Sequence, residues 1–208
     1  MEEQKEKSEI KENIRKFWKW LKGDSFGSWI VSIILAFVFV KFIFFPVLSL
    51  IFATSLPLVV VESGSMHHPQ TFAGGIIGIS DFNAWYANAE GWYNIRNISL
   101  ADMEDWSFKN GMDKGDIILV YGKKDLGVGD VIIFEADQKY PIIHRVVNKT
   151  IVNGRVIYET KGDNNNDQLP FEKEVTQDEI IGSSLLRIPK LGWIKLGLVE
   201  LLDKIRGN

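Results

Sequence analysis

The chain has 208 residues, of which 46% are hydrophobic, with no cysteine, three histidines and a formal net charge of -3 at pH 7. The lack of cysteine excludes a disulfide scaffold, a thiolate zinc site and a cysteine nucleophile, and so few histidines leave little material for a metal site. A mildly acidic balance excludes the basic surface with which proteins bind nucleic acid. We therefore expect no metal, no cofactor and no nucleic acid partner.

The first part of the chain divides into a charged segment and an apolar segment. Residues 1–28 alternate basic and acidic side chains, which predicts a solvated helical tail, and they end in aromatic residues typical of a membrane interface. From residue 29 to residue 61 the only charged side chain is Lys41. We expect one transmembrane helix over 29–51, kinked near Pro46, with a tight two-helix hairpin as the alternative.

Basic residues predict the orientation of this span. Lysine and arginine recur just before it, whereas the first basic residue after Lys41 is Arg96. By the positive-inside rule the N-terminus is cytoplasmic and the rest of the chain lies outside. The prediction is a single-pass protein of the cell membrane with an extracytoplasmic domain.

The chain after the span predicts a mostly β domain over residues 52–197. A β-branched stretch around Pro57 to Val61 predicts its first strand, and Asn153-Gly154 between β-rich arms predicts a hairpin. Glycines and β-branched runs predict further strands at 116–121, 130–135, 140–147 and 155–160.

Two segments differ from these strands. Residues 70–112 are rich in tryptophan, tyrosine and phenylalanine and are interpreted as an insertion. The alternatives for this segment are a lid, a membrane-contacting flap, a partner surface and a small helical cap that packs its own tryptophans. Residues 198–208 have leucine and isoleucine at helical spacing, which predicts an amphipathic tail that lies on the membrane or packs on the domain.

Ser65 is the candidate nucleophile of the chain. It lies in Ser63-Gly64-Ser65-Met66, directly after the first predicted strand. The Ser65 amide and the Ser63 hydroxyl would be close enough to stabilise one oxyanion. By itself, such a tripeptide is more typical of a flexible turn.

The candidate base is a histidine or a lysine. His67 and His68 follow Ser65 so closely that a side chain seldom curls back, so a surface or packing role is expected for them. His144 lies on an apolar β run. A histidine there is often a satisfied core residue, yet a rigid strand is also where a general base would be held.

Two carboxylates, Asp163 and Asp167, follow in a loop rich in glycine and asparagine. Such carboxylates could orient an imidazole and stabilise its cation. The alternative is a polar turn. An EF-hand is excluded because the remaining ligands of that motif are missing.

Taken in order, these motifs resemble those of type I signal peptidases. They are Ser-Gly-Ser-Met after a transmembrane segment, Gly-Asp-Ile-Ile-Leu-Val, Gly-Asp-Val-Ile-Ile-Phe, Ile-His-Arg-Val-Val and Thr-Lys-Gly-Asp-Asn-Asn. The resemblance covers residues from about 30 to 197. It implies a signal-peptidase-like β domain behind an N-terminal transmembrane helix, and a membrane-bound serine endopeptidase that removes signal peptides from exported preproteins.

The resemblance also implies roles for single residues. Ser65 would be the nucleophile and Ser63 an oxyanion contributor. His144 stands where bacterial members have a lysine base, which is similar to the archaeal and endoplasmic-reticulum branch. Asp163 matches the aspartate of the Lys-Gly-Asp motif and is expected to orient the histidine.

A further aspartate, six residues after the first, is frequent in the family and is replaced by Leu169 in this chain. Asp167, four residues after Asp163, is the second candidate for that role.

A preprotein is expected to pair with exposed strand edges, contacting Leu58, Val61, Tyr140 and Ile142. The family's preference for small residues at the -1 and -3 positions would follow from two shallow apolar pockets. Expected partners are signal peptides, membrane lipid and the Sec translocon. The alternatives are a non-catalytic membrane-anchored β-domain adaptor or assembly subunit, in which Ser65 and His144 lie far apart, and another membrane serine hydrolase.

Overall fold

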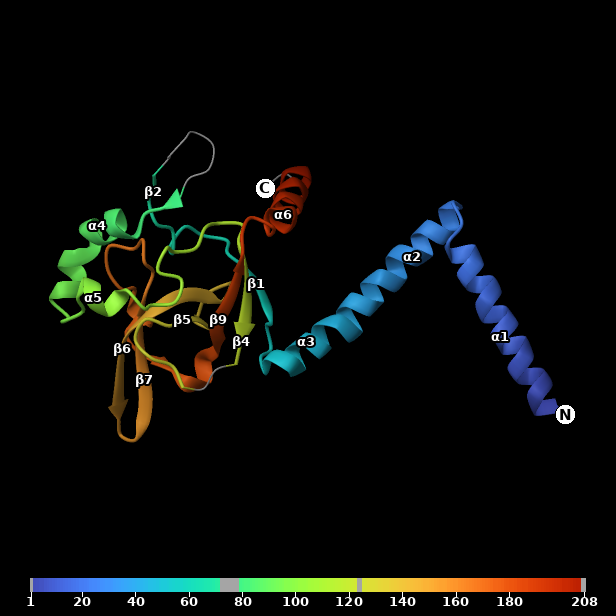
Figure 1. Ribbon diagram of the computed structural model, residues 1–208, viewed down its shortest axis with the longest axis horizontal. Helices are drawn as coiled ribbons and strands as arrows, with labels where there is room; N and C mark the ends of the chain where they lie inside the picture. The colour runs from blue at the N-terminus through green and yellow to red at the C-terminus, as the bar shows by residue number, and fades with distance from the viewer. Residues whose placement is uncertain (1, 72–78, 123–124, 207–208) are drawn as a thin grey trace. The chain divides into compact units, whose positions relative to one another are not determined.

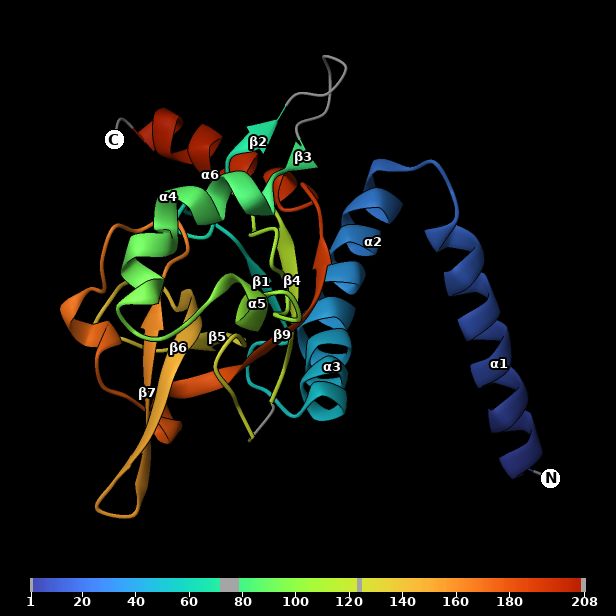
Figure 2. The ribbon, with the colours of Figure 1, turned by 60° about the vertical axis from the view of Figure 1, so that its left-hand side comes forward.

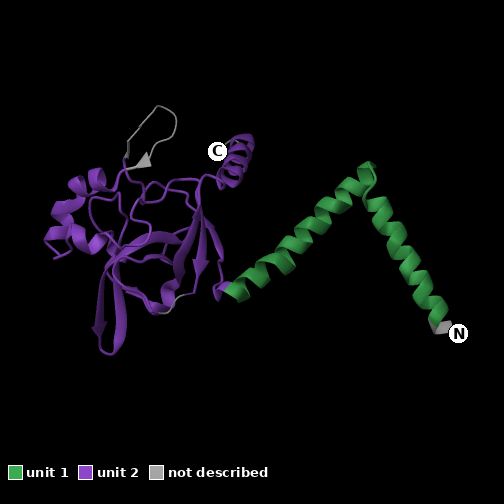
Figure 3. Cartoon of the chain, in the orientation of Figure 1, with its two compact units in different colours: residues 1–51 green, residues 52–208 purple. Residues whose placement is uncertain are grey.

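The chain forms two compact units, residues 1–51 and 52–208 (Figure 3). The computed structural model describes residues 2–71, 79–122 and 125–206. The first unit is helical, and its elements are α1 (Glu2–Leu21), α2 (Phe26–Phe39), a π-helical segment (Val40–Phe44) and the start of α3 (Phe45–Phe52).

The apolar helix is long enough, by length and composition, to cross a bilayer. It runs from Phe26 to Phe52, 27 residues, which at 1.5 Å per residue is about 40 Å against a hydrocarbon core of about 30 Å. Ser25 caps its start by accepting a hydrogen bond from the amide of Ser28. The π-helical segment ends just before Pro46, whose ring and missing N–H disturb the normal hydrogen-bond ladder. Residues 26–52 therefore form one distorted helix rather than a hairpin of two.

The second unit is built on a curled, seven-stranded antiparallel sheet, so the expected mostly β fold is confirmed (Figures 1 and 2). The strands in spatial order are β1 (Leu58–Val60), β4 (Ile117–Tyr121), β9 (Ile180–Ile188), β5 (Val131–Phe134), β6 (Ile142–Val152), β7 (Arg155–Lys161) and β8 (Val175–Thr176). The short strands β2 (Gln70–Thr71) and β3 (Ile79–Ser80) pair separately. Two 3-10 helices, Pro170–Glu172 and Gln177–Glu179, connect β7, β8 and β9.

The predicted hairpin is confirmed at the turn between β6 and β7. Asn153 and Gly154 both have positive φ values, 52° and 78°. These are the values that a two-residue type I′ turn requires, and asparagine and glycine adopt them at the least cost. The turn sets the register from Val152 to Asn148, and a one-residue shift between Val146 and Asn148 then places Arg145 opposite Lys161 and His144 close to the loop that follows β7.

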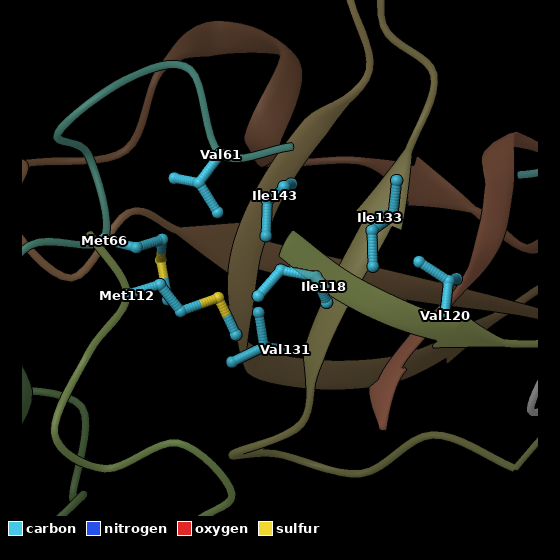
Figure 4. Close-up of a cluster of buried hydrophobic side chains, with 8 residues drawn as sticks. All are labelled: Val61, Met66, Met112, Ile118, Val120, Val131, Ile133 and Ile143. Carbon is cyan, nitrogen blue, oxygen red and sulfur yellow. The ribbon is translucent and has the colours of Figure 1, made fainter. Parts of the chain in front are cut away.

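A buried apolar cluster joins the strand before Ser65 to the strand that carries His144. It fills the inside of the curled sheet and consists of Val61, Met66, Met112, Ile118, Val120, Val131, Ile133 and Ile143. Figure 4 shows Val61 and Ile143 approaching each other from these two parts of the chain. Because protein interiors are closely packed, this cluster sets the spacing between the two strands.

The described part of the aromatic segment forms a helical cap. Its helices are α4 (Phe82–Asn94), capped by Asp81, and α5 (Leu100–Met103), which begins with a capping box of Ser99 and Asp102. The buried side chains of these helices and of the turn between them pack with Val147 of β6 and are Trp85, Tyr93, Ile98 and Met103. This agrees with the small helical cap among the alternatives for residues 70–112, although residues 72–78 lie outside the described residues.

Candidate active site

Ser65 lies in a tight turn directly after β1. Its hydroxyl oxygen is 3.1 Å from the hydroxyl oxygen of Ser63, and its amide donates to the same Ser63 oxygen at 3.5 Å. The turn is closed by the amide of His67, which donates to the carbonyl of Gly64. The two groups expected to contact one oxyanion therefore lie side by side.

His144 is buried on β6 and is held by a carboxylate that lies outside the sequence motifs. Its Nδ1 lies 2.5 Å from Oε1 of Glu172, which is completely buried. The same oxygen accepts from the Thr160 hydroxyl at 3.3 Å, and Oε2 accepts from the amide of Leu169 at 2.7 Å. A carboxylate on Nδ1 holds the proton there and leaves the Nε2 lone pair free to act as a base.

Nε2 of His144 and the backbone of Ser65 face a common point at Gly162. A side-chain carbon added to Gly162 would lie 2.8 Å from Nε2 of His144 and 2.9 Å from the carbonyl oxygen of Ser65. Asn164 fastens the two loops, since its amide donates to the Ser65 carbonyl at 2.7 Å and its side chain to the Gly64 carbonyl at 3.0 Å. The structure thus places the Ser65 carbonyl and Nε2 of His144 around Gly162, and it leaves no room for a side chain at residue 162.

Asp163 does not orient His144, so that expectation is corrected. Its carboxylate accepts two hydrogen bonds from the Arg145 guanidinium, at 2.9 and 2.7 Å, and one from Nε2 of His68 at 2.9 Å. Burial alone would raise the pKa of Asp163, but Arg145 and His68 outweigh it and hold that pKa well below its usual range. The physical reason for the correction is strand geometry: neighbouring residues point to opposite faces, so Arg145 takes Asp163 on one face while His144 points to the other.

Asp167 is likewise not bonded to His144. Its side chain is exposed and accepts a hydrogen bond from the indole of Trp92 at 2.8 Å, which lowers the pKa of its carboxyl. Trp85 donates from its indole to the carbonyl of Asp163 at 2.9 Å. The helical cap therefore holds the loop of residues 162–167 at two points, the carbonyl of Asp163 and the side chain of Asp167.

No motif in the sequence points to Glu172 or to the role of His68. Glu172 follows Pro170 at the start of a 3-10 helix, and a glutamate at that position often turns back to bond the amide before the helix, here that of Leu169. That local signal predicts a backward-facing carboxylate, but not its contact with a histidine. His68 is buried and stacks on Trp85 with ring centres 4.2 Å apart, whereas His67 is half-exposed and contacts Asp113 at 2.6 Å.

The four residues expected to contact substrate differ in their availability. Leu58 lies on β1, an edge strand paired only with β4 in the seven-stranded sheet, and Tyr140 is exposed. Ile142 pairs with Phe134 of β5, and the β7 pairing of the same strand begins only at Arg145. Residues 142–144 are therefore paired with β5 on one side and not with β7 on the other.

Val61 does not present an open edge, and the expectation of a substrate contact there is corrected. Its side chain lies in the core, and its N–H and C=O bond to residues 116 and 115. Because ladder bonds alternate along an antiparallel strand, Leu58 and Val60 direct their backbone groups away from β4.

The fold and the site define a class of protein. It is a β domain with an apolar, membrane-length helix before it, in which a serine turn meets a buried histidine–carboxylate pair. Within the described residues no group of three or more His, Asp or Glu side chains is arranged to hold a metal ion.

Comparison with known proteins confirms the resemblance to signal peptidases. The chain is 34% identical to the signal peptidase complex catalytic subunit SEC11 of Lachancea thermotolerans and to that of Eremothecium gossypii, and 30% identical to that of Colletotrichum graminicola. The first two matches cover 45% of this chain and 62% of the relative, so the chain spans less than two thirds of these relatives. No family model matches the chain.

Proposed function

We propose that this protein is a membrane-anchored serine endopeptidase that removes signal peptides from preproteins. The similarity to catalytic subunits of signal peptidase complexes supports the reaction class. The observation that carries the mechanism is the Glu172–His144 pair, whose free Nε2 faces the Ser65 turn across Gly162.

In the proposed reaction Nε2 of His144 takes the proton of the Ser65 hydroxyl as its oxygen attacks the scissile carbonyl. Glu172 keeps Nδ1 protonated and stabilises the imidazolium that forms. The amide of Ser65 and the hydroxyl of Ser63 donate to the oxyanion, the imidazolium returns its proton to the leaving amine, and a water activated by the same nitrogen releases the acyl group. In the structure the Ser65 hydroxyl contacts Ser63, and the proposed attack requires it to turn toward His144.

The substrate is proposed to bind as an extended strand along the free edge of β1, where Leu58 and Val60 offer unpaired backbone groups, or along residues 140–143. Main-chain pairing gives affinity there, and alternate side chains give specificity. The basic residues before the span favour a cytoplasmic N-terminus and an extracytoplasmic second unit. Membrane lipid and the Sec translocon are proposed as further partners.

The test is cleavage of a labelled preprotein by the purified full-length chain. Ser65→Ala and His144→Ala should each abolish processing while leaving membrane insertion intact, and Ser63→Ala should lower the rate by about 100-fold, as loss of one oxyanion donor does. Ser99→Ala, which removes only a helix cap, is the matched serine control. Substantial cleavage by the Ser65 and His144 variants would instead favour the non-catalytic adaptor.

A further inference from the structure

The C-terminal helix α6 (Trp193–Arg206) is fixed to the domain through its N-terminal half, as far as Glu200, which lies 3.5 Å from Lys114. The amide of Gly192 donates to the carbonyl of Gly115, and Leu196 is buried against the domain. Lys195 forms an ion pair with Glu62 at 2.9 Å. The base of the helix is thereby attached three residues before Ser65, and Figure 1 shows the helix projecting from the end of β9.

The face of α6 opposite Leu196 is an uncovered apolar stripe. Five aliphatic side chains on it are between 50% and 72% exposed: Ile194, Leu198, Leu201, Leu202 and Ile205. At 3.6 residues per turn they fall within an arc of about 100°, centred on the side away from Leu196. An arc of that width in a globular protein normally faces a core, whereas this one faces away from the domain.

Charged residues on α6 border this stripe in an ordered way. Lys195 and Arg206 lie next to one edge of the arc and Lys204 lies beyond the other, while Glu200 and Asp203 lie on the remaining face, by the same helical geometry. Trp193 opens the helix and is partly exposed. Aliphatic side chains bordered by lysine and arginine match the headgroup zone of a bilayer.

The bilayer is also within reach of α6. The membrane-length helix ends at Phe52 and β1 ends at Val60, so at most about 30 Å of extended chain separates them. A side-chain carbon on Gly192 would touch Val60, which places the start of α6 at the end of that same strand. The helix is about 21 Å long, short enough to lie flat in the interface beside the span.

We infer that α6 is an interfacial helix whose stripe of Ile194, Leu198, Leu201, Leu202 and Ile205 lies in the outer headgroup region of the membrane. It binds lipid, with Lys204 and Arg206 on the phosphate groups, and it holds the Ser65 turn at a fixed height above the bilayer. This inference goes beyond the proposed proteolysis and does not depend on it.

The absence of cysteine allows a direct test in the full-length protein reconstituted in lipid nanodiscs. Leu201→Cys on the stripe and Glu200→Cys on the remaining, polar face, both exposed, are each labelled with an environment-sensitive fluorophore. The Leu201 label should be quenched by brominated lipid and be at least several-fold less accessible to aqueous iodide than the Glu200 label. Anionic lipid should strengthen the lipid quenching.

Three outcomes would overturn the inference. Equal iodide quenching at the two positions would mean that the stripe faces water. Protection from iodide without quenching by brominated lipid would mean that a protein, such as a second copy of the chain, covers it. A Leu198→Glu/Leu202→Glu variant should lose the difference in iodide quenching between the Leu201 and Glu200 labels. An unchanged difference in that variant would contradict the lipid contact.

Discussion

Replacing Glu172 with glutamine removes the charge that orients His144 while keeping nearly the same shape. The two carboxylate oxygens of Glu172 accept from opposite sides, Oε1 from His144 and Thr160 and Oε2 from Leu169. A glutamine has one acceptor and one donor end, so either Nδ1–H of His144 or the amide of Leu169 must face an NH₂ group. The unfolding free energy should fall by about 1–3 kcal/mol, the cost of an unsatisfied buried donor.

The effect on catalysis should be larger than the effect on stability. Without the carboxylate, Nδ1 no longer holds its proton reliably and the imidazolium is not stabilised. Loss of that group in serine–histidine enzymes lowers kcat about 1,000- to 10,000-fold, which corresponds to about 4–5.5 kcal/mol of transition-state stabilisation. KM should change little because Glu172 is buried and does not reach a bound peptide.

The assay is the steady-state cleavage of a labelled preprotein by full-length protein in liposomes, with thermal unfolding measured on the same samples. Glu179→Gln is the matched control. Glu179 ends the next 3-10 helix and makes the same kind of bond to the amide before it, that of Thr176, but its side chain is exposed. Glu179→Gln should leave kcat within about twofold. A folded Glu172→Gln variant with kcat within tenfold of the wild type would refute the role assigned to Glu172.

Two further substitutions and one pH dependence follow from the geometry. Gly162→Ala should abolish cleavage, because the new carbon would lie under 3 Å from both His144 and the Ser65 carbonyl. The control Gly91→Ala, in an open position on α4, should raise stability by about 0.5–1 kcal/mol. Equal cleavage activity of the two variants would contradict the close approach at Gly162. Asp163→Asn should cost about 3–5 kcal/mol of stability at neutral pH, because it leaves Arg145 buried beside a neutral group, as thermal unfolding would show. Folding lowers the pKa of Asp163, so the contribution of Asp163 to the free energy of unfolding is complete above its unfolded pKa of about 3.9 and is lost as the pH falls toward the folded pKa. Plots of stability against pH for wild type and Asp163→Asn should therefore converge in acid. Parallel plots would count against the Arg145 pairing.

The sequence by itself determines the membrane-length helix, the strands and the hairpin. Hydrophobicity alone located the membrane-length helix, and alternating β-branched residues with Asn153-Gly154 predicted the strands and the hairpin. These are local properties, because a helix of sufficient length and a type I′ turn depend on residues that are neighbours in sequence. Ser65 and His144 were predicted as partners through the resemblance to signal peptidases.

The tertiary structure decided which carboxylate faces His144. Residues 144 and 145 point to opposite faces of β6, so the partner of each depends on what the loop after β7 brings to that face. Asp163 reaches Arg145 and His68, while the chain needs nine further residues to return Glu172 to His144. No sequence spacing encodes such a return, because it depends on the packing of the aromatic cap, the 3-10 helix and the sheet together.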